Sequence, residues 1–266
     1  MLKKGKRRGG WRVGGWAGLA AALLVAPRLA IAGPPLITDD PETVEKGHWE
    51  INIPYTLEVS PKDAAGDRTW SHETPLLDMA YGLFDGHQLK LEVPMQVLDM
   101  PGEGPRGGLG DLSLGYKWRL VDEEQGPLGL SVYPQVSLPL GDSDRGFGTG
   151  SPALLLPVQI GKHFLDDKLY VYGDVGYDRQ YARDEVDTWG AGIAVEGEVT
   201  DRLTLCGELR YSFGVGGEHD DQLWQLGAKV KLTDSLNLLG AAGRSFNPGE
   251  DGGSDLLVYL GIQLTF

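Results

Sequence analysis

The chain has 266 residues, of which 41% are hydrophobic, and it contains 40 glycines and one cysteine, Cys206. One cysteine excludes an internal disulfide and a multi-cysteine metal site. When residues 1–32, which contain basic but no acidic side chains, are left out, the chain holds 17 Lys and Arg against 38 Asp and Glu. The resulting formal net charge of −21 (17 − 38) argues against nucleic acid as a partner. The remaining length suits one domain.

Residues 1–32 have the order of a secretory signal peptide. Basic residues at positions 3–12 precede an apolar run over 14–26, and Ala30-Ile31-Ala32 follows. This order predicts cleavage before Gly33. The run is shorter than the about 20 residues of a transmembrane helix, and no later stretch approaches one. A mature chain that spans a membrane would therefore cross it as strands.

Residues 33–47 are proline-containing and acidic and show no periodicity. We expect them to form a periplasmic N-terminal segment near the mouth of the fold that follows. From residue 48 onward the pattern changes to alternation of apolar and polar or small residues, which is typical of strands with one apolar face. About twelve such strands are predicted, at residues 48–60, 77–83, 89–97, 111–120, 128–138, 154–162, 169–178, 188–199, 203–213, 222–232, 236–246 and 256–266.

The terminal strand shows the pattern most clearly, because six apolar residues occupy every second position from Leu256 to Phe266. Eleven residues at about 3.3 Å each, tilted by about 40°, rise roughly 28 Å, which is close to the thickness of the hydrocarbon layer. A two-sheet sandwich could also hide the apolar faces. Strand length, the signal peptide and the final Phe266 favour a barrel instead.

Short and long connections alternate between the predicted strands. This alternation predicts an all-β fold, an antiparallel transmembrane β-barrel over residues 48–266 with both termini in the periplasm. The charged and tyrosine residues on the other strand face are then candidates for lining the lumen: Glu50, Glu58, Asp78, Lys90, Glu92, Lys117, Arg119, Tyr133, Tyr170, Tyr172, Asp174, Glu196, Glu208, Arg210, Lys229, Lys231 and Tyr259.

Two interpretations of this interior remain open. The charges could pair with one another and fill a narrow barrel, or they could border a polar conduit that selects solutes by charge. The tyrosines could narrow such a passage or contact an aromatic solute. About eight strands leave an interior filled by side chains and about sixteen leave an aqueous channel, so twelve strands lie between these cases.

No catalytic, cofactor-binding or metal-binding residues stand out. Some twelve-stranded barrels are phospholipases with a Ser–His pair, but all five histidines here fall in predicted loops, turns or strand ends. The acidic runs at 218–221 and 250–255 lack the spacing of an EF-hand. A solvated loop is the favoured interpretation of each, ahead of calcium binding or a bridge to lipopolysaccharide. Enzymatic activity is therefore not expected.

Several short stretches are spread over the chain after residue 32: Ile37-Thr-Asp-Asp-Pro41, Gly47-His-Trp-Glu50, Gly108-Leu-Gly-Asp111, Ser137-Leu-Pro-Leu-Gly-Asp142, Gly148-Thr-Gly150 and the strand that ends at Phe266. In these stretches the chain resembles a family of bacterial outer-membrane proteins named for the MetA pathway of phenol degradation. The resemblance implies an outer-membrane barrel that passes small organic compounds, hydrophobic ones included. It supplies no catalytic or ligand residues.

Three functional hypotheses follow. The favoured one is an outer-membrane channel or transporter for small, hydrophobic or aromatic organic solutes, without a cofactor. The alternative is a structural or adhesive barrel with a plugged lumen, and the least favoured is a barrel hydrolase. The expected partners are outer-membrane lipid, lipopolysaccharide and a small-molecule solute, with no nucleic acid.

Overall fold

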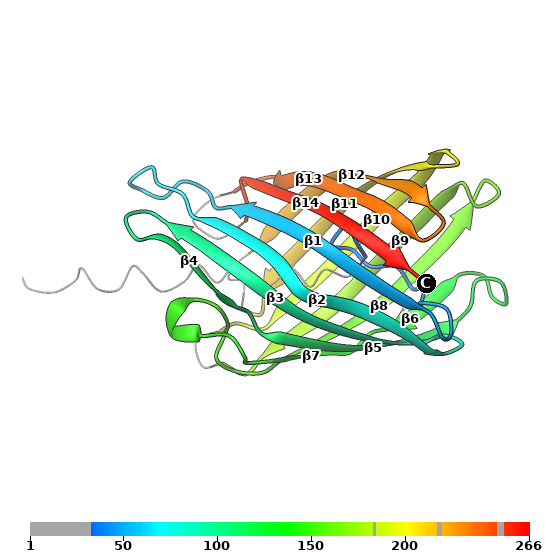
Figure 1. Cartoon of the computed structure of the whole chain (residues 1–266), viewed down its shortest axis with the longest axis horizontal. Helices are drawn as coiled ribbons and strands as arrows, with labels where there is room; N and C mark the ends of the chain where they lie inside the picture. The colour runs from blue at the N-terminus through cyan, green and yellow to red at the C-terminus, as the bar shows by residue number, and fades with distance from the viewer. Residues whose placement is uncertain (1–32, 183–184, 217–219, 249–252) are drawn as a thin grey trace, which may run out of the picture.

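The computed structural model describes residues 33–182, 185–216, 220–248 and 253–266, which form a closed antiparallel β-barrel (Figure 1). The predicted signal peptide, His219 and parts of both acidic runs lie outside the described residues. The strands are β1 (Trp49–Val59), β2 (Trp70–Phe84), β3 (His87–Met100), β4 (Gly104–Leu109), β5 (Leu112–Val121), β6 (Gly129–Val132), β7 (Gln135–Leu138), β8 (Ala153–Phe164), β9 (Leu169–Gln180), β10 (Thr188–Thr200), β11 (Leu203–Gly214), β12 (Asp221–Thr233), β13 (Leu236–Ser245) and β14 (Leu256–Thr265).

These fourteen segments make twelve barrel strands. β4 and β5 both pair with β3, one after the other, and β6 and β7 both pair with β5 and β8. The barrel closes where β14 pairs with β1, from Glu50 opposite Thr265 to Val59 opposite Leu256. The predicted all-β, antiparallel barrel of about twelve strands is confirmed. The periplasmic position of the termini stays a prediction.

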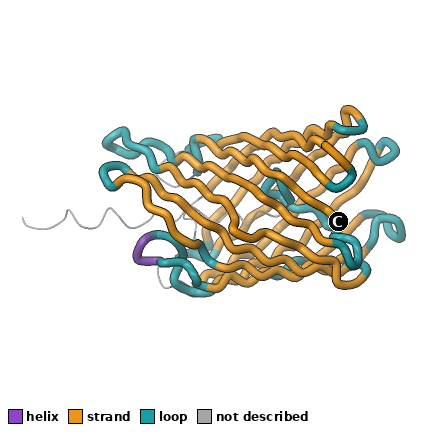
Figure 2. The backbone as a smooth tube through the Cα atoms, viewed as in Figure 1, coloured by secondary structure: helices purple, strands orange, loops and turns teal. Residues whose placement is uncertain are grey.

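The two ends of the barrel differ in their connections (Figures 1 and 2). The short-turn end carries the turns at 85–86, 122–128, 165–168, 201–202 and 234–235 together with the C-terminus. The long-loop end carries the connections at 60–69, 139–152, 181–187, 215–220 and 246–255, as well as the β3–β4 hairpin. The stretch between the predicted strands 89–97 and 111–120 is not a simple loop, because residues 104–109 form β4 and continue the ladder with β3.

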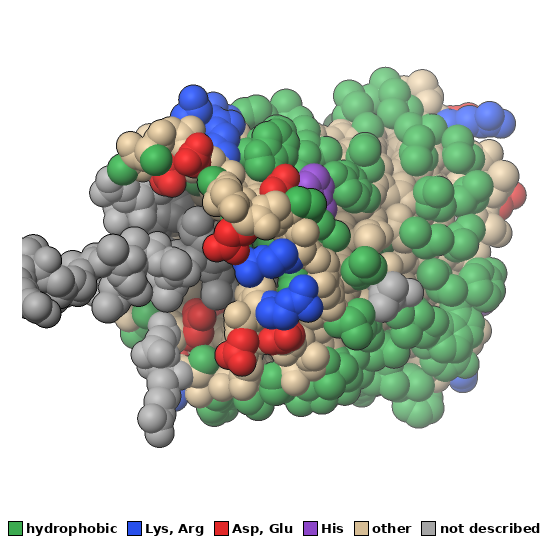
Figure 3. Space-filling view, turned by 60° about the vertical axis from the view of Figure 1, so that its left-hand side comes forward, with side chains coloured by type: hydrophobic (Ala, Val, Ile, Leu, Met, Phe, Trp, Pro, Cys, Tyr) green, Lys and Arg blue, Asp and Glu red, His purple; other side chains and the backbone are tan. Residues whose placement is uncertain are grey.

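The outer face of the barrel is apolar. Its leucines and isoleucines are among the most exposed side chains, for example Leu226 at 64% and Leu260 at 55%. Hydrophobic side chains cover the wall in Figure 3, and charged ones gather toward the long-loop end. Such a surface is stable only in hydrocarbon, and a closed barrel leaves no unpaired strand edge there. The barrel therefore spans a membrane.

Aromatic side chains border this apolar belt at both ends. Such girdles mark the two membrane–water interfaces of outer-membrane barrels. The exposed aromatic residues include Trp49, Phe84, Trp118, Phe164 and Phe266 toward the short-turn end, and Trp70, Tyr181, Trp189, Phe213 and Phe246 toward the long-loop end. Among the described residues, no helix has the length and apolar character needed to cross a bilayer.

A bulge in β2 changes which residues of that strand face the lumen. The pairing of β2 with β3 shifts between Pro75 and Leu77. An extra residue in a strand reverses the alternation of its side chains. As a result, Glu73 faces the interior before the bulge and Asp78, only 1% exposed, does so after it.

Candidate functional site: the barrel lumen

The N-terminal segment (residues 33–47) enters the barrel from the short-turn end, and its residues 34–39 are buried inside the barrel (Figure 1). Leu36 is 1% exposed and belongs to an interior apolar cluster with Tyr172, Ala194 and Leu239. Ile37 packs in a second interior cluster with Leu223 and Leu257. The apolar residues of the segment are thus buried against inward side chains of β9, β10 and β12–β14.

Polar contacts fix the backbone of this segment. The amides of Ile37 and Thr38 donate to the two carboxylate oxygens of Glu208, at 2.9 and 2.7 Å. The Asp39 amide donates to Asp174 Oδ2 at 3.0 Å. Val44 donates its amide to Gln88 Oε1 at 2.8 Å. Inward side chains therefore satisfy backbone groups that would otherwise be buried without partners.

Asp39 is the charged anchor of the segment. Its carboxylate lies 2.9 Å from Lys117 Nζ and also accepts a hydrogen bond from Gln159 Nε2. Lys117 in addition donates to the backbone oxygen of Asp40 at 3.0 Å. Burial raises the pKa of the Asp39 carboxyl to about 6, although Lys117 acts to lower it and Asp40 adds to the rise.

Most of the predicted lumen-lining charges form ion pairs inside the barrel. Lys90 lies 3.4 Å from Asp78 and 3.8 Å from Glu92. A second pair joins Arg210 to Asp174 at 2.9 Å, and a third joins Lys229 to Glu196 at 2.7 Å. These contacts correspond to the first of the two interpretations of the interior, in which charges pair and fill space.

The remaining candidates have other positions. Glu50 accepts a hydrogen bond from Asn52, and Tyr172 donates to Glu196 Oε1 at 2.7 Å. Tyr133 lies under Lys117, whose Nζ is 5.0 Å from the ring centroid, and Tyr170 stacks on His163 at 3.9 Å. At the short-turn end, Arg119 and Lys231 pair with turn residues, Asp122 at 3.1 Å and Asp234 at 2.9 Å.

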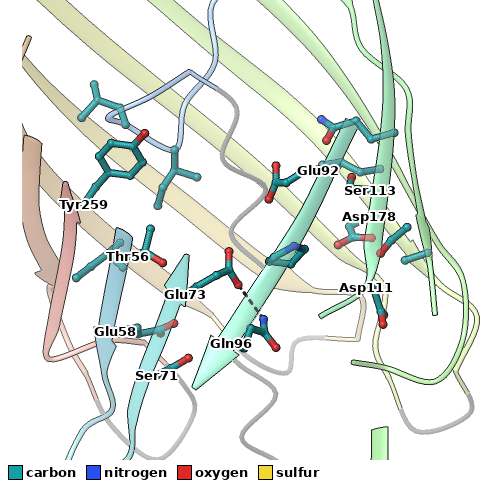
Figure 4. Close-up of a pocket in the computed structure, with 18 of the residues that line it drawn as sticks. Thr56, Glu58, Ser71, Glu73, Glu92, Gln96, Asp111, Ser113, Asp178 and Tyr259 are labelled. Atoms are coloured by element: carbon teal, nitrogen blue, oxygen red, sulfur yellow. Dashed lines mark hydrogen bonds between the residues drawn. The ribbon is translucent and has the colours of Figure 1, made fainter. Parts of the chain in front are cut away.

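The long-loop half of the lumen contains a cavity of about 180 Å³, which we call the vestibule (Figure 4). Pro35, Leu36 and Ile37 of the N-terminal segment form part of its lining, so the segment closes the side of the vestibule that faces the short-turn end. Its walls combine apolar side chains with five carboxylates: Glu58, Glu73, Glu92, Asp111 and Asp178. Only Glu58, Glu92 and Tyr259 of the predicted lumen-lining candidates border this cavity.

The candidate set omitted several vestibule residues, for two different reasons. Glu73 lies outside the predicted strand 77–83, because the bulge at 75–77 breaks the alternation that identifies the rest of β2. Asp178 and Gln96 continue the regular alternation of β9 and β3, so the pattern itself contains the signal for them. Asp111 likewise continues the alternation of β5.

Asp111 also anchors the connection 139–152 at the long-loop end. Its carboxylate accepts hydrogen bonds from the Gly141 amide at 2.9 Å and from the Thr149 amide at 3.3 Å. Phe147 in this connection is fully buried against Gly108, where an added Cβ would lie 2.3 Å from the ring. Asp111, Gly141 and Thr149 belong to three of the short stretches that carry the family resemblance. These stretches therefore meet around the Asp111 carboxylate.

The amino-acid sequence matches the protein family described as "Putative MetA-pathway of phenol degradation" over residues 33–256. The chain belongs to this family. No curated protein sequence matches it. The matched range includes the N-terminal segment as well as almost the whole barrel.

Solved structures share the fold of this family member. One is an outer membrane channel from Pseudomonas putida F1, 18% identical, with a TM-score of 0.66 over 85% of this chain and 98% of that chain. Another is the KdgM porin, 12% identical, with a TM-score of 0.53 over 82% of this chain and 99% of that chain. Together with the apolar belt and the aromatic girdles, this outer-membrane type of barrel places the chain in a bacterial outer membrane.

The two solved structures are a channel and a porin rather than enzymes. In this chain, the side chains of His72 and His87 are hydrogen bonded to Tyr55 and Tyr116, at 2.8 and 2.7 Å. His163 bonds to a carboxylate of the turn at 122–128. Within the described ranges, no group of three or more His, Cys, Asp or Glu is arranged to hold a metal ion.

Proposed function

We propose that the chain is an outer-membrane channel for small organic solutes with apolar parts, and that the N-terminal segment closes it. The observation that carries this proposal is the vestibule, an internal cavity between the barrel wall and the N-terminal segment, which closes one side of it. Displacing that segment would connect the vestibule with the short-turn end without opening the β-ladder. The fold shared with a channel and a porin supports the same function.

The walls of the vestibule favour solutes that are partly hydrophobic. Leu36, Leu155 and Leu257 face a cavity that also contains carboxylates and amides. A purely aqueous pore has no need of such side chains, whereas an organic solute gains by burying its apolar surface against them. The family description, which refers to phenol degradation, is consistent with an aromatic solute. No cofactor and no chemical step enter this proposal.

A second candidate function is a structural or adhesive barrel with a permanently plugged lumen. The burial of Leu36 through Asp39 and their hydrogen bonds favour it, because such contacts also suit a segment that never leaves. The external connections would then carry the function.

Single-channel conductance in a planar bilayer separates the two candidates. We expect the mature protein to show brief openings and a variant without residues 33–41 to conduct steadily. Heat-modifiable migration in electrophoresis confirms that each protein is folded before it is tested. If the folded variant is as silent as an empty bilayer, the channel proposal is refuted and the plugged barrel is supported.

We propose that the barrel is oriented in the outer membrane with its long-loop end outside the cell. Residues 1–32 are then a signal peptide, 33–47 enter from the periplasm, and 48–266 form the barrel in contact with outer-membrane lipid and lipopolysaccharide. The variant Ala64→Cys tests this orientation by labelling intact cells with an impermeant maleimide, since the natural Cys206 is buried. Labelling only after cell disruption would reverse the assignment.

A further inference from the structure

We infer that the vestibule binds organic ammonium ions with an apolar body, and that it favours them over neutral and anionic solutes of the same shape. This inference deepens the proposed function by naming the class of solute that the cavity selects. It rests on the acidic lining, on buried acceptors without hydrogen-bond donors and on the apolar side chains of the same lining.

The acidic and basic side chains that line the vestibule are all of one kind, namely carboxylates. Five carboxylates border the vestibule, and among its described lining residues there is no Lys, Arg or His. In Figure 4, Glu58, Glu73 and Glu92 lie on the neighbouring strands β1, β2 and β3, and Asp111 and Asp178 lie further around the wall. Lys90 contacts Glu92 at 3.8 Å from outside the lining, and it also pairs with Asp78 at 3.4 Å. The vestibule therefore keeps an excess of negative charge.

Two deeply buried side chains of the lining hold polar atoms without partners. Gln225 is 2% exposed, and its Nε2 donates to Glu208 at 2.9 Å while its Oε1 has no donor. Tyr259 is 4% exposed, and its hydroxyl has no partner. Buried acceptors without donors are rare in folded proteins. An ammonium group supplies N–H donors, whereas a carboxylate or a hydrocarbon supplies none.

The apolar part of the lining provides the surface against which the apolar body of the solute would pack. Leu36, Leu155 and Leu257 border the same cavity as the carboxylates, so a solute with one charged end can contact both kinds of side chain. The cavity of about 180 Å³ suits a compact molecule. Phenethylammonium, 2-phenylethanol and phenylacetate share one shape and differ chiefly in charge, and they therefore serve as probes.

The experiment measures binding of these three probes at pH 7 by calorimetry, using the refolded mature protein in phosphatidylcholine nanodiscs. Empty nanodiscs correct for partition into lipid. We expect phenethylammonium to bind at least about tenfold more tightly than either other probe, since one partly screened charge pair is worth about a factor of ten. Equal affinities, or preference for the neutral or anionic probe, would overturn the inference.

Two conservative variants locate the binding. Glu73→Gln and Asp178→Asn each remove one charge from the vestibule and should weaken phenethylammonium binding by about threefold to tenfold. The matched control is Asp234→Asn, which removes the same charge from an exposed turn at the short-turn end and should change nothing. An equal loss in the control would show that net charge, not the vestibule, attracts the amine.

Conductance measurements on the same preparations distinguish a failure of this inference from a failure of the proposed function. A barrel that conducts without preferring phenethylammonium refutes the inference and leaves the channel intact. A barrel that binds the amine but stays silent, even without residues 33–41, refutes the channel and leaves the binding site.

Discussion

Glu208 holds the N-terminal segment with both oxygens of one carboxylate. It accepts the amides of Ile37 and Thr38, and its Oε1 also accepts Gln225 Nε2 at 2.9 Å. At 4% exposure it is shielded from water that could replace these donors. One side chain thus determines whether two backbone groups of the segment are satisfied inside the lumen.

The substitution Glu208→Ala should release the segment. Hydrogen bonds to a charged group contribute about 1.5–3 kcal/mol each, and the variant loses both backbone contacts. We expect a higher open probability in planar bilayers and faster protease cleavage near residue 40. The control Glu198→Ala removes a carboxylate from an exposed position near the short-turn end. Unchanged gating in folded Glu208→Ala would show that other contacts hold the segment.

Two adjacent glycines of β4 provide a matched test at the long-loop end. A Cβ at Gly108 would lie 2.3 Å from the Phe147 ring, whereas a Cβ at Gly107 would meet nothing closer than 3.8 Å. Overpacking typically costs about 1–3 kcal/mol. Gly108→Ala should therefore expose the connection 139–152 to protease, and Gly107→Ala should not. Equal cleavage of both variants would contradict the assigned packing.

At the scale of elements, side-chain packing and polar contacts join most of the N-terminal segment to the barrel. Leu36 and Ile37 pack in apolar clusters, Asp39 pairs with Lys117, and the segment amides bind inward carboxylates of β9 and β11. Backbone pairing joins the segment to the wall at the short-turn end, where Lys46 bridges to Gly82 of β2 and the Gly47 amide donates to the Gly82 oxygen at 2.7 Å. An element held in this way can leave the lumen while the β-ladder stays intact.

The docking of the segment should depend on pH through Asp39. Its pKa, raised by burial to about 6, means that the docked segment binds a proton more tightly than the free one. The stabilising contribution is therefore present at low pH and is lost as the pH rises through about 6. From pH 5 to pH 7.5, docking should weaken by about tenfold, and open probability should rise.

Asp39→Asn is the variant that tests this pH dependence, because it cannot titrate and keeps the size of the side chain. Its conductance should show no step near pH 6. A step of the same size in the variant would assign the titration to another group.

At the scale of the whole molecule, the closed barrel depends on its environment. Leu260 lies near the middle of β14 with 55% of its surface exposed, on the face that meets lipid. Closure through the β14–β1 ladder gives every barrel strand two neighbours. The hydrocarbon layer thereby becomes the solvent for the outer face, and charge on that face is costly in proportion to depth.

Leu260→Arg should lower the free energy of unfolding in liposomes by about 2–4 kcal/mol. Leu140→Arg introduces the same side chain at an equally exposed position in the connection 139–152, and it should cost about 0–1 kcal/mol. Denaturant titration followed by tryptophan fluorescence measures both. Equal costs would mean that the apolar belt does not lie where the strand pattern places it.

The alternation of side chains along each strand, with a period of two residues, determined much of the predicted fold. Strand side chains alternate whatever lies around them, so stretches such as Leu256 to Phe266 were enough to predict strands with one apolar and one inward face. Strand length, the signal peptide and the final Phe266 then favoured a barrel over a sandwich. The same rule put Lys90, Asp174 and Glu208 on the inward face. It could not tell whether those charges pair with one another or border an open passage, because pairing depends on residues far apart in sequence.

Tertiary structure alone decided what fills the lumen. Residues 33–47 have no period, so nothing local predicts that Leu36 and Asp39 lie buried among strands more than a hundred residues away. The bulge at 75–77 likewise depends on pairing with β3, and it is what brings Glu73 into the vestibule. Alternation along one strand is a property of the backbone, whereas a plug and a cavity arise only when distant segments compete for the same enclosed space.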